Sequence, residues 1–106
     1  MVSHVDKKEE VKKFIDEGKE KLVVLDFFAT WCGPCRAIAP EVEELSKKYP
    51  NVKFGKVDVD VDEECSSEYK IECMPTFVFF KEGKEIERFS GADSAKLKAV
   101  IEKYAN

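Results

Sequence analysis

Two cysteines, Cys32 and Cys35, are the residues of this chain most suited to chemistry, and they lie in the segment Trp-Cys-Gly-Pro-Cys. At this spacing their sulfur atoms can close a small disulfide ring or remain as two thiols. An apolar run at 22–29 predicts a buried strand before them, and residues 36–49 predict a helix after them. At such a helix N-terminus, free backbone N–H groups and the helix dipole stabilise a thiolate. Because the thiolate attacks disulfides, this context indicates thiol–disulfide exchange.

The two cysteines have different predicted roles. Cys32 comes first in the turn and is expected to have the more exposed sulfur, so it is the candidate nucleophile. Cys35, about one helical turn deeper, is the candidate resolving thiol that releases the reduced substrate. Between them, Gly33 allows a tight turn and Pro34 suits a first helical turn, where a missing N–H costs little.

Asp26 interrupts the apolar run that precedes the cysteines. Burial of a carboxylate is costly and raises its pKa, and charges inside central strands often belong to functional sites. Asp26 lies six residues before Cys32, near the carboxyl end of the predicted strand, so we expect it to serve Cys35 as a general acid or base through water. A hydrogen-bonded structural aspartate is the alternative. Lys56, on the next predicted strand, is a candidate to modulate Asp26.

Cys65 and Cys73 complete the set of four cysteines. A zinc site built from all four is disfavoured, because zinc turns usually carry closely spaced pairs and these two are far apart, so no metal is predicted. Cys65 is expected to be half-buried in a short helix. Cys73 is expected to be exposed, where it could accept a reversible cap or link two chains. A bridge between Cys65 and Cys73 stays open at this point.

Composition and charge limit the class of protein. The chain has 106 residues, 43% of them hydrophobic and 38% charged, which predicts one globular domain over residues 1–106. The net charge of −4, without a basic stripe, argues against nucleic acid as a partner. The first residues do not resemble a secretory signal and no apolar run is long enough for a membrane span, so a cytoplasmic location is expected.

The periodicity of apolar residues predicts an α/β architecture. A helix is expected between Asp6, as a cap, and Gly18, and a C-terminal helix is expected to begin near Asp93. The other predicted elements are strands at 2–4, 52–57, 76–80 and 85–89 and a short helix at 63–69, with a hairpin turn at 81–84. Early β-α-β crossovers imply parallel pairing and the hairpin adds antiparallel pairing. The expected fold is a three-layer α/β/α arrangement, with a mixed sheet of about five strands and about four helices.

Several segments together resemble the thioredoxin family over nearly the full length of the chain. They are residues 24–27, 29–35, Pro40, 74–76 and 89–92. Residues 73–77 are similar to the animal cytosolic members in particular. The resemblance implies the thioredoxin fold, with Cys32 as nucleophile, Cys35 as resolving thiol and Asp26 as the buried proton partner.

The resemblance also implies a substrate groove beside the two cysteines. In that groove Pro75 would be in cis, which would leave the backbone of Cys73 and Met74 free to pair with an extended substrate. Trp31 would shield the site, and the other lining residues would be Gly33, Pro34, Met74, Gly91 and Ala92.

Partners follow from the same resemblance. A thioredoxin reductase supplied by NADPH would recharge the dithiol, and no cofactor would be bound to the chain itself. Clients would be oxidised proteins of the peroxiredoxin, methionine sulfoxide reductase and ribonucleotide reductase types. The chain would be a monomer, with a homodimer linked through Cys73 as a second state, and it could also occur in the nucleus or be secreted without a signal peptide.

Three other functions remain as alternatives. An oxidase or isomerase of the same fold is disfavoured, because those proteins usually carry a histidine where this chain has Pro34. A binding module that uses the groove near Trp31 without redox chemistry is compatible with the sequence. Metal storage predicts zinc in the purified reduced protein.

Overall fold

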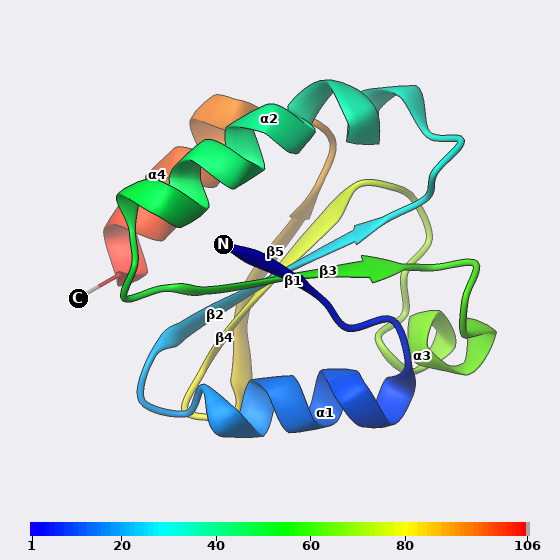
Figure 1. Ribbon diagram of the computed structural model, residues 1–106, viewed down its shortest axis with the longest axis horizontal. Helices are drawn as coiled ribbons and strands as arrows, with labels where there is room; N and C mark the ends of the chain where they lie inside the picture. Colours follow the sequence, from blue (N-terminus) through cyan, green and yellow to red (C-terminus); the bar gives the residue numbers. More distant parts are fainter. Residues whose placement is uncertain (106) are drawn as a thin grey trace.

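Strand β2 (Leu22–Phe28) lies at the centre of a five-stranded sheet in the computed structural model, which describes residues 1–105 (Figure 1). The strand order is β1-β3-β2-β4-β5. The bounds of the other strands are β1 (Val2–His4), β3 (Lys53–Asp58), β4 (Thr76–Lys81) and β5 (Lys84–Ser90). β2 is parallel to β3 and antiparallel to β4. The predicted mixed sheet is therefore confirmed.

Four helices cover the two faces of this sheet in the described part of the chain. Figure 1 shows α1 (Lys8–Glu17) and α3 (Glu63–Glu68) on one face, and α2 (Gly33–Lys48) and α4 (Ser94–Tyr104) on the other. This is the three-layer α/β/α arrangement expected from the sequence. None of the helices within residues 1–105 is long and apolar enough to cross a membrane.

Side chains of β2 contribute to two apolar clusters, one on each face of the sheet. Val23, Leu25 and Phe27 pack with residues of α1 and α3, whereas Val24 packs with residues of α2 and α4. Because side chains alternate along a strand, Asp26 lies on the same face as Val24. The carboxyl group is thereby placed on the face that α2 covers, which is the helix that carries Cys32 and Cys35.

Two helix starts differ from the prediction. α1 begins after Lys7 rather than after Asp6, because the Asp6 carboxylate is used elsewhere: its Oδ1 accepts a hydrogen bond from the Asp58 backbone N–H at 3.0 Å. α2 begins at Gly33, earlier than the predicted residue 36, because the Cys32 side chain acts as its cap. The predicted start of α4 is confirmed, since Asp93 caps it by accepting from the Lys96 N–H at 3.0 Å.

Candidate active site

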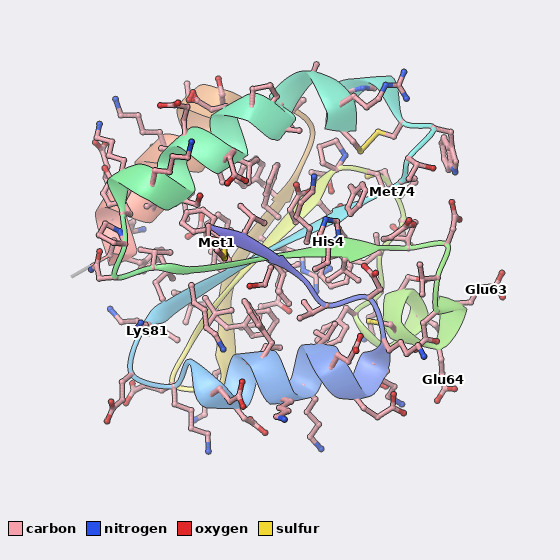
Figure 2. All side chains as sticks on the ribbon, in the orientation of Figure 1. Met1, His4, Glu63, Glu64, Met74 and Lys81 are labelled. Carbon is pink, nitrogen blue, oxygen red and sulfur yellow. A yellow bond between two sulfur atoms is a disulfide. The ribbon has the colours of Figure 1, made fainter. Side chains whose placement is uncertain are left out.

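A disulfide joins Cys32 and Cys35 at the N-terminus of α2, and Figure 2 shows it as a yellow bond between sulfur atoms. Cys32 is the N-cap residue, and its Sγ accepts a hydrogen bond from the Cys35 backbone N–H at 3.1 Å. Pro34 occupies the first turn, which contains no acidic residue. A sulfur at this position receives both a backbone donor and the positive end of the helix dipole. After reduction, this environment favours a thiolate on Cys32.

We expected Cys32 to have the more exposed sulfur, but exposure does not distinguish the two cysteines. Cys32 is 6% exposed and Cys35 is 4% exposed, so both residues are buried in the disulfide form. Their positions separate them instead. The Cys32 Sγ lies 3.7 Å from the carbonyl oxygen of Met74, on the side of β4, whereas Cys35 lines a surface depression on the side of β3.

Met74, one of the residues predicted to form a groove, packs against Cys32. The Met74–Pro75 peptide bond is cis, as the resemblance implied. The Gly91 N–H donates to the Pro75 carbonyl at 2.9 Å and holds the loop after β5 against the loop before β4. Gly91 has a φ of +105°, a conformation that favours glycine, and exposed Ala92 follows it. The Cys73 carbonyl is not free, since it accepts from the Thr76 hydroxyl at 2.6 Å.

Trp31 is fixed beside the disulfide but does not cover it closely. Its side chain is 65% exposed, and its Nε1 donates to Oδ2 of Asp60 at 2.8 Å. Asp58 supports this contact, because its Oδ1 accepts from the Asp60 N–H at 3.0 Å. Sequence reasoning missed Asp60. The signal that could have found it is the parallel pairing of β2 with β3, which brings the residues after both strands to one edge of the sheet.

Asp26 is buried on the face of β2 that α2 covers, with 2% of its surface exposed. Its Oδ1 has no hydrogen-bond partner among residues 1–105, which argues against the structural alternative of a fully hydrogen-bonded aspartate. Burial raises the pKa of the Asp26 carboxyl to about 7, and the charge of Lys56 opposes this rise. Lys56 is the register neighbour of Asp26 on β3, which agrees with the predicted proximity.

Cys65 and Cys73 are both free thiols, so the bridge between them that the sequence left open is not formed. Cys73 is exposed as predicted, but the half-buried position expected for Cys65 is wrong: it is 0% exposed. Burial and the nearby carboxylate of Asp62 raise the pKa of the Cys65 thiol to about 11. No cluster of three metal-ligating side chains occurs within the described residues.

Comparisons with known proteins agree with this geometry. The family model described as "Thioredoxin" matches residues 2–103. The thioredoxin of Callithrix jacchus is 48% identical over 98% of this chain and 99% of its own length, and that of Homo sapiens is 48% identical over 95% and 96%. The X-ray structure of Fasciola hepatica thioredoxin is 51% identical, covers 96% of this chain and 98% of its own, and superposes with a TM-score of 0.93. The chain therefore belongs to the thioredoxin family, whose members are thiol–disulfide oxidoreductases.

Proposed function

We propose that this protein reduces disulfides in other proteins through Cys32 and Cys35. The observation that carries the proposal is the disulfide across the first turn of α2, with the Cys32 sulfur at the helix cap. This arrangement stores two electrons when reduced. It also holds the outgoing sulfur where a thiolate is stabilised, which favours return to the dithiol when a reductant is present.

The exchange proceeds in two steps. The Cys32 thiolate attacks one sulfur of the substrate disulfide, forms a mixed disulfide, and the other substrate sulfur leaves as a thiolate. Cys35 then loses its proton and attacks the Cys32 sulfur, which breaks the mixed disulfide and releases the second substrate thiolate. The substrate gains two electrons, and the cysteine pair loses two and becomes a disulfide. The released thiolates take up protons to become thiols.

Asp26 is the proton acceptor that we propose for Cys35. Its carboxyl lies on the face of β2 that α2 covers, and its raised pKa of about 7 suits proton transfer near neutral pH. The contact would be made through water. Lys56 would tune the carboxyl, because its positive charge favours the ionised form.

The substrate would lie along the loop before β4. The Met74 carbonyl faces the Cys32 sulfur, and the Met74 N–H has no backbone partner among residues 1–105. An extended peptide could therefore pair with the Met74 backbone as a short added strand. Trp31 on one side and Gly91 and Ala92 on the other would supply further contact area.

Recharging requires a source of electrons outside the chain. Membership of the thioredoxin family supports a flavoprotein thioredoxin reductase that draws on NADPH. Peroxiredoxins, methionine sulfoxide reductases and ribonucleotide reductase are the client classes that we propose, in the cytoplasm. The exposed Cys73 supports a disulfide-linked homodimer as a second state of the monomer.

The redox equilibrium against a graded glutathione buffer tests the proposal. Mass spectrometry would report which cysteines pair at each step of the series. We expect a bridge between Cys32 and Cys35 with a potential below that of the glutathione pool. A markedly higher potential would make the protein an oxidant or isomerase, and pairing at other cysteines would overturn the assignment.

A binding module is the second candidate function, because Trp31 is 65% exposed and Val61 is 51% exposed near the same edge of the sheet. Exposed apolar side chains of this size are common at protein contacts. The double variant Cys32→Ser/Cys35→Ser separates the two functions. Retained affinity for a protein captured by the native chain, with reduction lost, would support a binding function beside catalysis. Loss of both would contradict it.

A further inference from the structure

A second surface depression lies against Cys35, on the opposite side of β2 from the proposed substrate groove. Its volume is about 210 Å³. The groove lies toward β4, where Met74 meets Cys32, whereas this depression lies toward β3, because Lys56 of that strand lines it. The full lining is Phe28, Ala29, Thr30, Cys35, Arg36, Ala39 and Lys56. The two sites are therefore separated by the active-site turn.

The charge of this depression is positive, although the protein as a whole carries a net charge of −4. Lys56 and Arg36 are its two ionised lining residues, and no acidic side chain lines it. Neither cation has a carboxylate within salt-bridge distance among residues 1–105. The Arg36 Nη1 donates only to the Thr30 carbonyl, at 2.8 Å, which orients the guanidinium and leaves other donors available.

Apart from Thr30, the rest of the lining is apolar. Phe28 and Ala39 are half-buried, and the Lys56 Nζ lies 4.5 Å from the centre of the Phe28 ring. An apolar cavity of about 150 Å³ is large enough to bind benzene in another protein. A depression of about 210 Å³ therefore has room for an aromatic ring with one small polar group. An inorganic anion would leave the apolar wall in water, and a neutral ring would leave both cations unpaired.

We propose that this depression binds a small aromatic carboxylate, with its ring against Phe28 and Ala39 and its carboxylate between Lys56 and Arg36. The ligand would contact the Cys35 side of the active-site turn without entering the groove for protein substrates. Charge-assisted hydrogen bonds to the two cations would supply selectivity for the anion, and burial of the ring would supply affinity. Binding of the carboxylate is measured without any exchange reaction, so an absence of binding would leave the proposed function intact.

Titration of the oxidised protein with benzoate, followed by amide chemical shifts at constant ionic strength, tests the site. The neutral analogue benzyl alcohol is the comparison. We expect shifts at Thr30, Arg36 and Ala39, a millimolar dissociation constant for benzoate, and binding of benzyl alcohol about tenfold weaker, as the loss of one charged partner implies. Equal binding of both compounds, shifts centred on Met74 and Gly91, or no saturable shift would each overturn the proposal.

Charge variants sharpen the assignment. Lys56→Gln and Arg36→Gln should each weaken benzoate binding by about tenfold and leave benzyl alcohol unchanged. Lys98→Gln removes one positive charge from the exposed side of α4 and is the matched control, which should bind benzoate as the native protein does. A loss in the Lys98 variant as large as in the other two would show a general charge effect and would overturn the site.

Discussion

Two helices of this protein carry a cysteine at the same position, yet the two cysteines differ in chemistry. Cys35 is the third residue of α2 and Cys65 is the third residue of α3. Cys35 is half of the disulfide, whereas Cys65 is a free thiol whose pKa is raised to about 11. The caps also differ: α2 is capped by the Cys32 sulfur, and α3 is capped by the Asp62 carboxylate.

The difference shows that a helix N-terminus alone does not make a thiol reactive. Acidic residues fill the first turn of α3, and the carboxylates of Asp62, Asp6 and Glu9 add to the effect of burial on the Cys65 thiol. The first turn of α2 has no acidic residue. Asp26, on the face of β2 that α2 covers, has a pKa raised to about 7 and is therefore partly neutral at physiological pH.

The largest expected effect on the rate of disulfide reduction comes from removing the sulfur of Cys32, which caps α2. Cys32→Ser should lower the rate of protein disulfide reduction by at least about 1,000-fold, because a serine hydroxyl cannot replace the thiolate. Cys65→Ala is the matched control and should leave the rate close to that of the native chain. An insulin-type turbidity assay measures both.

The trapping variant assigns the two roles. Cys35→Ser should accumulate a mixed disulfide through Cys32, which mass spectrometry would identify after digestion. A mixed disulfide through Cys35 in the Cys32→Ser variant, formed as readily, would reverse the roles of nucleophile and resolving thiol.

Alkylation of the reduced native protein compares the reactivity of the thiols at the two helix N-termini directly. We expect iodoacetamide to modify Cys32 at least about 1,000-fold faster than Cys65, since only a small fraction of a thiol with a pKa near 11 is ionised at pH 7. Cys73, which is exposed, is the internal reference for access. Peptide mapping at timed intervals gives the rates. Comparable rates for Cys65 and Cys73 in the folded protein would contradict the comparison between α2 and α3.

The next prediction concerns the buried carboxyl of Asp26. The pKa of Asp26 is about 7 in the folded state against 3.8 for the free group, so the native protein binds this proton more tightly. The free energy of unfolding should therefore fall as pH rises from about 4 to about 7, by about 4 kcal/mol in total. Asp26→Asn should remove this loss, and it should also slow the exchange reaction near neutral pH. Denaturant unfolding across this pH range measures the slope.

The matched control for that experiment is Asp16→Asn, which changes an exposed carboxyl on α1. It should leave the pH dependence as in the native chain. If the free energy of unfolding of Asp26→Asn still falls with pH as it does in the native protein, another group carries the proton.

The smallest expected effect on the reduction rate comes from the hydrogen bond between Trp31 and Asp60, which joins the segments before α2 and α3. Asp60→Ala removes the acceptor for the Trp31 Nε1 and should slow reduction of a protein disulfide by about threefold, as the loss of one exposed hydrogen bond implies. It should also increase the mobility of Trp31, measured by fluorescence anisotropy. Asp60→Asn retains a carbonyl acceptor and should restore both values. An Asn variant as impaired as Ala would assign the effect to the lost charge instead.

The sequence was sufficient for the order of elements, because their signals are local. Apolar runs and the Cys-Gly-Pro-Cys turn determine where β2 ends and α2 follows, and the fold class was predicted correctly from them. The start of α2 was placed too late, because a cysteine is not an ordinary capping residue and its role requires the folded turn.

Contacts between distant segments were harder to predict. The bond between Trp31 and Asp60 depends on the register of β2 against β3, which no local pattern specifies. The full burial of Cys65 depends on how α3 packs against the sheet, and six residues of mixed polarity do not reveal that orientation. The hydrogen bond from Asp58 to Asp6, which displaced the predicted cap of α1, is a contact of the same kind.

The central place of β2 has a consequence for the motions of the active site. Its backbone is bonded to β3 on one side and β4 on the other, so its amide protons can exchange with solvent only through opening of the whole sheet. The loop that carries Cys73 and Met74 precedes β4 and lacks such pairing, so it can open locally. Hydrogen exchange should therefore be slowest along β2 and much faster along the loop that carries Cys73 and Met74.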